Sequence, residues 1–385
     1  MTDEPGQVAK SSATGGGVPA RGSSLVRVLG RVDAFGVAVT ERTLSLYAAA
    51  ALRIGYGMIF LAYLLREFPH REEIWGPSSP MAPALARELL DRTGWFSVLT
   101  VSDSPTYFEA CYALALLVCV LFAIGWRTRV LSIVFAIVVT SFYARSILMT
   151  DGGDNLITLM SIYMVCTACG RRWSLDARRA GLRGSTRRRM RPFMRLEASE
   201  FARQLGVARR ILVTVLHNCG MVVIGAQICI LYATAGLYKA QGTDWDNGTA
   251  LHYVLNLSLF QPWPALSAVA DSHPMMIAIA AYLTVLVQVA FPFALFGRLK
   301  YVILSMLLCM HLGIAVLMGL PLFSGSMVIA DAVFLSDRFY IHVGQRAQRL
   351  MRRAGAKTPN ASGPIGDPLL PQQQTRTATT LDRTQ

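Results

Sequence analysis

The stretch from Ile211 to Leu237 reads ILVTVLHNCGMVVIGAQICILYATAGL, and Tyr238, Lys239 and a short polar turn follow it. The stretch contains no Asp, Glu, Lys or Arg. It is longer than the roughly 20 apolar residues that a helix needs to cross about 30 Å of hydrocarbon. It therefore predicts a transmembrane helix with an amine at its mouth, which either reaches back to water or is withdrawn from it.

The rest of the chain has the composition of a polytopic membrane protein. Hydrophobic residues make up 53% and charged residues 16%, and the mean hydropathy is +0.42. Seven further apolar runs occur, at Leu44–Leu65, Pro105–Gly125, Val130–Met149, Leu156–Cys169, Met275–Phe296, Tyr301–Met318 and Phe323–Leu335. We expect an all-α bundle of about eight transmembrane helices. The fourth and eighth runs are short, so seven crossings and one re-entrant segment remain an alternative.

Basic residues gather in alternate connections. Trp126–Arg129 and Gly297–Lys300 carry two positive charges each, and Arg171–Arg210 carries thirteen arginines against three acids. The connections Arg66–Ser104 and Lys239–His273 have more acids than bases. The positive-inside rule then places both termini in the cytoplasm of a multi-pass cell-membrane protein. The net charge of +14 indicates contact with anionic membrane lipids, and no nucleic-acid partner is expected because aromatic interleaving is missing.

Composition divides the chain into four parts. They are a largely disordered cytoplasmic tail (1–40), a transmembrane domain (41–337), a basic juxtamembrane segment (338–354) and a second disordered cytoplasmic tail (355–385). No secretory signal is expected before the first apolar run. On the outer side, Ala82–Val98 and Asn247–Phe260 are flanked by tryptophans and predict interfacial helices.

Ionisable residues inside a membrane are costly and usually face a partner or a cavity. The predicted topology puts several of them near the outer ends of the helices: Glu109, Arg145, Asp151, Asp154, Lys239 and His311. We expect them to line one outward cavity. Each of these residues also has an alternative, structural interpretation. Arg145 would form an ion pair with Asp151 or Asp154, and Arg53 would form one with Asp331. His311 would be a core histidine with its hydrogen bonds satisfied, and Lys239 would be an anchor at the membrane interface.

The cysteines and the other potential metal ligands do not predict a disulfide, a redox site or a metal site. All seven cysteines lie inside or at the ends of apolar runs, where a thiol behaves as a small hydrophobe. Cys166 and Cys169 have the spacing of a redox or metal motif, but no second pair or nearby histidine completes it. We therefore expect neither a disulfide nor a metal.

Four motifs follow one another along the chain. They are Asp151-Gly-Gly-Asp154-Asn155-Leu156, Arg171-Arg-Trp-Ser-Leu-Asp176, Tyr238-Lys239 with Asp244-Trp245, and Met310-His311 leading to Gly319-Leu-Pro-Leu-Phe323. Together they resemble the horizontally transferred transmembrane (HTTM) family, which includes the membrane part of vitamin K-dependent gamma-carboxylase and sporulation-delaying protein B. The resemblance covers roughly Leu44 to Asp337.

The resemblance implies a helical bundle in which Lys239 acts as the base for oxygenating a reduced naphthoquinone, menaquinone-like. His311 is the second catalytic candidate. A lysine has an unperturbed pKa near 10.4, and burial can lower such a value by about 3 to 5 units. The ligand-binding candidates are Arg145, Asp151, Asp154, Gln288 and Trp245.

The chain departs from the carboxylase at four points. Its spacing from Lys239 to Trp245 is one residue longer, and a single lysine stands where the carboxylase carries two. Asp-Gly-Gly-Asp stands where the carboxylase has a histidine, and the large carboxylase domain is missing. Glutamate carboxylation is therefore not expected. Besides an oxidoreductase for a quinol or other lipophilic substrate, two classes remain open. One is a non-enzymatic maturation or partner protein for an exported peptide, and the other is a transporter, for which no two-fold repeat is visible. The sequence does not predict the oligomeric state.

Overall fold

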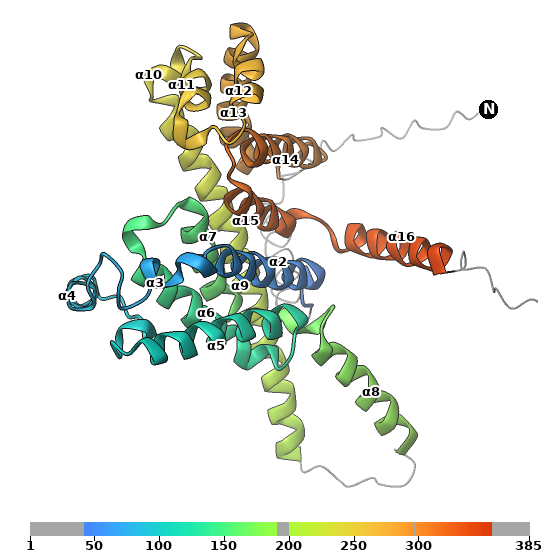
Figure 1. Cartoon of the computed structure of the whole chain (residues 1–385). Helices are drawn as coiled ribbons and strands as arrows, with labels where there is room; N and C mark the ends of the chain where they lie inside the picture. The colour runs from blue at the N-terminus through green and yellow to red at the C-terminus, as the bar shows by residue number, and fades with distance from the viewer. Residues whose placement is uncertain (1–41, 191–199, 296, 356–385) are drawn as a thin grey trace, which may run out of the picture. The chain divides into compact units, whose positions relative to one another are not determined.

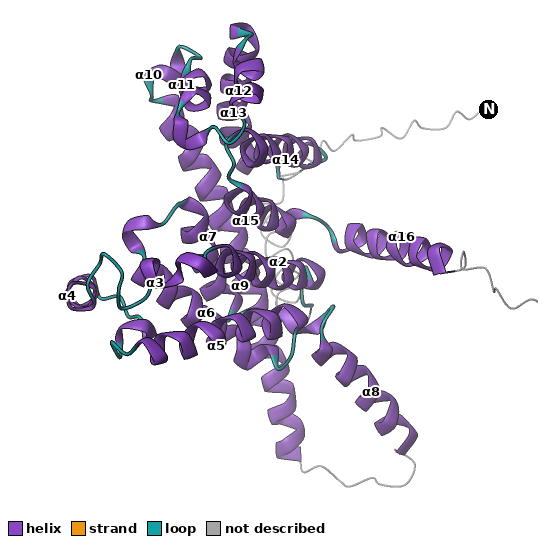
Figure 2. Cartoon of the chain, in the orientation of Figure 1, coloured by secondary structure: helices purple, strands orange, loops and turns teal. Residues whose placement is uncertain are grey.

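The computed structural model of the chain describes residues 42–190, 200–295 and 297–355. The described residues form helices joined by loops, and none of them lies in a strand (Figure 2). This confirms the expected all-α class. The residues up to Tyr340 form one compact unit, and a second unit begins at Ile341. The tails predicted to be disordered, apart from Gly355, lie outside the described residues.

Six of the described helices are long and apolar enough to cross a membrane. They are α2 (Leu46–Arg66), α5 (Pro105–Ile124), α6 (Thr128–Arg145), α9 (Glu200–Ala240), α13 (Pro274–Ala294) and α14 (Leu299–Leu317), labelled in Figure 1. Each of them contains most of one predicted apolar run. The expectation of a membrane protein is met at this level.

Two predicted runs form shorter helices. The fourth run corresponds to α7 (Gly152–Met164), with 13 residues, and the eighth to α15 (Pro321–Asp331), with 11 residues. A 3-10 turn, η6 (Ala332–Phe334), continues α15. At 1.5 Å per residue, α7 measures about 20 Å, which is less than the roughly 30 Å of a bilayer core. These are the two runs that left the number of crossings open.

Helix α9 begins earlier than its apolar run. It has 41 residues, and its first part is exposed and carries an ion pair between Arg203 and Glu200 at 2.5 Å. A helix of this length measures about 60 Å, more than a membrane core requires. Much of the basic connection before it is helical as well, in α8 (Leu175–Met190).

Shorter helices fill the connections. Between α2 and α5 lie η1 (Phe68–His70), α3 (Arg71–Ile74), α4 (Pro83–Thr93) and η2 (Val98–Thr100). Between α9 and α13 lie α10 (Thr243–Asp246), α11 (Ala250–Asn256), η5 (Ser258–Phe260) and α12 (Pro264–Asp271). The others are η3 (Ile147–Met149), η4 (Cys169–Arg171) and α16 (Asp337–Gly355). Both segments predicted to be interfacial thus contain a helix, α4 in one and α11 in the other.

The hydrophobic core of the first unit extends from α2, α5, α6 and α7 to α9, α13, α14 and α15. Helix α5 packs against α2 and α6, and α7 packs against α6 (Figure 1). Aromatic rings fill the space between them, with Phe122 stacked on Phe135 at 4.3 Å and Phe60 edge-on to Phe135 at 6.0 Å. Offset and edge-to-face geometries are those that aromatic pairs prefer.

Helices α9, α13, α14 and α15 position the remaining polar groups. Helix α13 packs along α9 and against α14, and α14 packs against α15. Gly236 permits the close approach of α9 to α13, because a Cβ at this position would lie 2.8 Å from Val289 and 3.0 Å from Gln288. Small residues have this role at helix contacts in membranes. Gln288 is thereby brought up to the last turn of α9.

Candidate functional site

Lys239 lies in the last turn of α9 and is half-buried against α13. Its Nζ donates to Gln288 Oε1 across 3.1 Å and lies 3.4 Å from the carbonyl oxygen of Ala235. The ring of Trp245 lies beside the amine, with its centroid 5.5 Å from Nζ, a distance at which a cation is attracted to an aromatic face. The structure therefore brings three of the predicted residues together.

A second polar group connects three helices close by. The Tyr232 hydroxyl, on α9, donates to Asp331 Oδ2 on α15 across 3.0 Å and lies 3.0 Å from His311 Nε2 on α14. All three residues are buried, with exposed fractions of 1% for Tyr232, 8% for Asp331 and 2% for His311. We call Asp331, Tyr232 and His311 the relay. Gln288 connects the two groups, because its Nε2 donates to Met310 Sδ across 3.6 Å and Met310 precedes His311 on α14.

One atom at each end of the relay has no partner. His311 Nδ1 and Asp331 Oδ1 are both buried and make no hydrogen bond within the described residues. Because Tyr232 gives its one proton to Asp331, the bond between Tyr232 and His311 requires a hydrogen on Nε2. Nδ1 is then an acceptor for which the described residues offer no donor.

This arrangement can carry a proton. If a proton binds His311 Nδ1, the Nε2 hydrogen can move to the Tyr232 oxygen while the Tyr232 hydrogen moves to Asp331. The two hydrogen bonds of the relay then reverse direction and the carboxylate is neutralised. Chains of ionisable groups inside membrane proteins commonly serve such transfers.

Tyr232 was not among the predicted site residues. It lies seven positions before Lys239, which is two helical turns, so both side chains project from one face of α9. The spacing of seven residues could therefore have predicted that Tyr232 lies on the same helix face as Lys239. Sequence spacing could not predict the contact between Tyr232 and Asp331, because the two residues are 99 positions apart and lie on different helices.

Arg145 is buried and donates to backbone carbonyl oxygens rather than to a carboxylate. It is 2% exposed, and its Nη2 donates to the carbonyl oxygens of Gly76 at 2.9 Å and Met81 at 2.8 Å. No carboxylate lies within ion-pair distance of it in the described part of the chain. The suggested ion pair with Asp151 or Asp154 is therefore wrong. The loop after α3 offers carbonyl oxygens that no helix satisfies, and the guanidinium binds those.

Asp151 and Asp154 form the N-terminal cap of α7. Asp151 Oδ1 accepts from the backbone N–H groups of Gly153 at 2.6 Å and Asp154 at 3.0 Å, and Asp154 Oδ2 accepts from the N–H of Asp151 at 3.1 Å. Such a reciprocal pair satisfies N–H groups that have no partner inside the helix. The Asp-Gly-Gly-Asp motif thus has a structural explanation.

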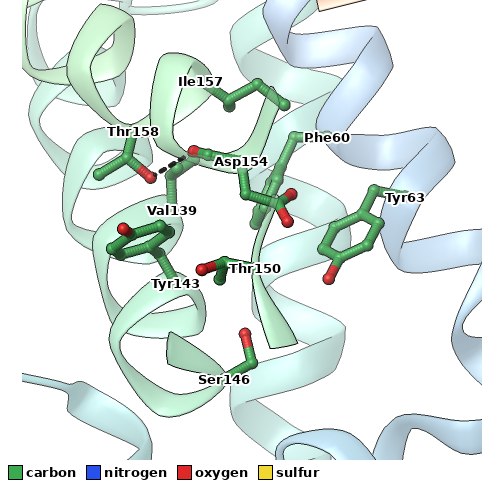
Figure 3. Close-up of a pocket in the computed structure, with 9 residues that line it drawn as sticks. All are labelled: Phe60, Tyr63, Val139, Tyr143, Ser146, Thr150, Asp154, Ile157 and Thr158. Carbon is green, nitrogen blue, oxygen red and sulfur yellow. Dashed lines mark hydrogen bonds between the residues drawn. The ribbon is translucent and has the colours of Figure 1, made fainter. Parts of the chain in front are cut away.

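Asp154 also borders a small pocket between α2, α6 and α7 (Figure 3). Tyr63, Tyr143 and Thr150 also line it, and Thr158 donates to the Asp154 carbonyl oxygen across 2.8 Å. The empty space is about 240 Å³ including its open side, which is below the roughly 300 to 1,000 Å³ of pockets for small organic ligands. The pocket does not include Lys239 or His311.

Arg53 and Asp331 do not pair. Arg53 donates to the carbonyl oxygens of Cys169 at 3.1 Å and Trp173 at 2.6 Å, while Asp331 accepts from Tyr232. As with Arg145, backbone carbonyl oxygens bind the buried guanidinium, and one nitrogen of each group, Arg53 Nε and Arg145 Nη1, has no hydrogen-bond partner among the described residues. The predicted site residues do not share one set of contacts in the described part of the chain. They are divided among separate sites, so these contacts do not form the single outward cavity that was expected.

All seven cysteines are free. Among the described residues, no three His, Cys, Asp or Glu side chains gather in a way that could hold a metal ion.

In comparisons with known proteins, no family model matches the chain, and no curated protein and no solved structure matches it either.

Proposed function

We propose that the protein is a multi-pass cell-membrane protein of the HTTM type that oxidises a quinol or a similar lipophilic substrate. The observation that carries the proposal is the amine of Lys239, held 3.1 Å from Gln288 Oε1 beside the buried relay. Two neighbouring proton acceptors, Lys239 and the relay, are what the removal of two protons from a quinol requires.

The topology that accompanies this proposal has eight crossings, with α7 and α15 as the two short ones. Both termini then lie in the cytoplasm together with 30 of the 37 Lys and Arg residues. The positive-inside rule supports this orientation. Lys239 and Trp245 then lie at the outer side.

Two buried atoms without a hydrogen-bond partner support binding of a substrate that has hydroxyl groups. His311 Nδ1 and Asp331 Oδ1 are buried and unbonded among the described residues, and a buried polar atom is costly when it stays unpaired. A hydroxyl donor near Nδ1 would remove part of that cost. Gln288 and Trp245 hold Lys239 in position beside the same place.

The proton transfers are then assigned as follows. In its neutral form, Lys239 accepts one proton, and His311 accepts the other at Nδ1 and passes it through Tyr232 to Asp331. A quinol bound there would supply two electrons and O₂ would take them, which gives the quinone and, with the two protons returned, hydrogen peroxide. Atoms and charges balance, and both bases are restored.

Access from the lipid is supported by the outer surfaces of α9 and α13. Leu237, Leu286 and Phe293 are exposed apolar side chains on these helices. Within the apolar windows, 28% of α13 and 17% of α14 are buried, against 56% of α6. A lipophilic substrate would reach Lys239 along such a surface.

The low burial of α13 and α14 within the protein also favours a second candidate function. Helices α13 and α14 leave most of their apolar surface to lipid or to another helix, which suits a non-enzymatic maturation or partner protein for an exported peptide. In that case Lys239 is a structural residue. No redox chemistry is then required.

The test uses the full chain in lipid nanodiscs, with reduced menaquinone and O₂, and measures quinone and hydrogen peroxide. The variants are Lys239→Met and Lys239→Arg, with Lys300→Met as control, because Lys300 also lies at a helix end beside an aromatic ring, 5.1 Å from the Tyr301 centroid. We expect a loss of about 100-fold or more for both Lys239 variants, and none for the control. Equal turnover by all four proteins would remove Lys239 as base. No turnover in the unsubstituted chain, together with crosslinking of an exported peptide to α13 or α14, would favour the second function.

A further inference from the structure

A larger cavity lies around η4, where α6 begins and α8 follows. Its empty space is about 860 Å³ including its open side. The residues that matter are Thr128 and Arg129 at the start of α6, Arg171 and Arg172 at the end of η4, and Asp176 and Ala180 on α8. None of them belongs to the Lys239 centre, so the proposed function does not use this cavity.

The cavity wall is strongly basic. Arg129, Arg171 and Arg172 line it, and Asp176 is its one acidic residue. In the described parts of the chain, none of the three guanidinium groups has a carboxylate within ion-pair distance. Arginines in a hollow without an acidic partner are an arrangement typical of anion binding.

Asp176 does not neutralise these arginines, because its carboxylate has other partners. Its oxygens accept from the backbone N–H of Arg127 at 3.0 Å, from the N–H of Thr128 at 2.7 Å, and from the Thr128 hydroxyl at 2.9 Å. The carboxylate therefore caps the first turn of α6. The lining keeps a net positive charge, because it has three guanidinium groups and one carboxylate.

The arginines also act on one another. Burial, and then the charges of Arg129 and Arg210, lower the pKa of the Arg171 guanidinium. Arginine stays protonated in spite of this. The crowding of like charges therefore has a free-energy cost, which a bound anion would reduce.

The backbone that carries Arg171 is held in place. Gly170 packs so tightly that an added Cβ would lie 1.9 Å from Thr128 Oγ1. Arg53 binds the carbonyl oxygens of Cys169 and Trp173 on either side of the two arginines. A site on a fixed backbone loses little conformational entropy when a ligand binds.

We propose that this cavity binds a phosphate group, carried by an anionic membrane lipid or by a free phosphate compound. A guanidinium offers parallel N–H donors that match the oxygens of a phosphate. The cavity lies in the connection that follows the apolar helix α7. In the topology proposed above, it is at the level of the cytoplasmic headgroups, where anionic lipids are found.

The test uses the full chain purified in a neutral detergent and measures binding as a shift of thermal unfolding. One arm adds micelles doped with phosphatidylglycerol, the second adds phosphatidylcholine and the third adds inorganic phosphate. Arg171→Gln removes a charge inside the cavity, and Arg183→Gln removes the same charge from an exposed position on α8 outside it. Ala180→Phe fills the cavity without a change of charge. Its control is Gly181→Phe, because an added Cβ at Gly181 meets nothing within 4 Å.

We expect Arg171→Gln and Ala180→Phe to weaken phosphatidylglycerol binding about tenfold or more, and both controls to stay within about twofold. Inorganic phosphate that binds and competes with the lipid would identify a free phosphate compound as a sufficient ligand. A preference for phosphatidylglycerol without phosphate competition would identify the lipid. If neither probe binds more tightly than phosphatidylcholine, or if the controls lose as much as the cavity variants, the proposal fails. Should Arg171→Gln not fold, Ala180→Phe and its control decide the question.

Discussion

The Tyr232 hydroxyl donates to Asp331 across 3.0 Å and thereby joins α9 to α15 inside the protein. The same oxygen lies 3.0 Å from His311 Nε2. One side chain thus satisfies two buried ionisable residues, each of which already has another atom without a partner in the described structure. The relay therefore depends on this hydroxyl more than on either of its neighbours.

Tyr232→Phe keeps the ring and removes the hydroxyl. We expect a loss of about 1 to 3 kcal/mol in the free energy of unfolding, because His311 Nε2 and Asp331 Oδ2 are both left without a partner. Equilibrium unfolding in mixed micelles measures it. Tyr163→Phe is the control, since its hydroxyl donates to Gln227 across a longer 3.4 Å in a partly buried site. Equal losses in the two variants would show that the relay adds no stability.

Gln288→Leu tests whether the amide positions Lys239. The side-chain oxygen is the acceptor 3.1 Å from Nζ, and its removal leaves the amine free to turn away. We expect quinol turnover by the full chain to fall about tenfold through lost orientation, with a larger effect on kcat than on KM. Gln227→Leu, on the same helix as Lys239, is the control. Unchanged kcat in Gln288→Leu would contradict a positioning role.

The helices were largely predictable from the sequence. An apolar run of about 20 residues has few alternatives to a helix, because a membrane leaves no water for its backbone groups. The start of α9 at Glu200 was missed, since arginine-rich residues outside the apolar run carry no such constraint. The shortness of α7 and α15 was visible in their runs.

The contacts of the polar residues were predictable only in part. Lys239, Trp245 and Gln288 were each predicted as site candidates, but the contacts that join them were not predicted. The partners of Arg145 and Arg53 were not predicted either, because the sequence does not show which loop carbonyl oxygens lack a helix partner. The role of Asp151 was readable in principle, because an acid three residues after a capping residue is a signature of a helix start.

Gly153→Ala tests the close packing of α7 on α15. An added Cβ would lie 3.1 Å from the Cα of Phe323 and 3.2 Å from Ser326 Oγ, and backbone cannot move aside cheaply. We expect a loss of about 1 to 3 kcal/mol, the usual effect of overpacking. Gly181→Ala, in open space on α8, is expected to change stability by about 0.5 to 1 kcal/mol in the favourable direction. Unfolding curves in mixed micelles compare the two, and equal signs would contradict this account.

Asp271 predicts a pH dependence outside the long apolar helices. The Asn256 amide, at 3.0 Å, and the His252 ring, at 2.7 Å, lower the pKa of the Asp271 carboxyl. Because the folded-state pKa is below the unfolded value of about 3.9, the carboxylate stabilises α11 and α12 above that pH. This contribution is lost as the pH falls through the lowered pKa.

The measurement is the Tm of the full chain and of Asp271→Asn between about pH 2 and pH 7. We expect a higher Tm for the unsubstituted chain at pH 6 and a difference that shrinks below about pH 4. Asp246→Asn is the control, since the Asp246 side chain makes no hydrogen bond or ion pair in the part of the chain described. A Tm difference independent of pH would contradict the role of Asp271.

Labelling of cysteines on either side of α7 decides whether this helix crosses the membrane. Leu148, in η3 before α7, is 78% exposed, and Gly181, in α8 after it, borders open space. In a chain whose seven native cysteines are replaced by serine, we expect an impermeant maleimide to label Leu148→Cys in intact cells. Gly181→Cys should be labelled only after permeabilisation, because the arginines around it keep it in the cytoplasm. Both positions reacting from one side would mean that α7, at about 20 Å, is re-entrant, and the number of crossings would then be seven.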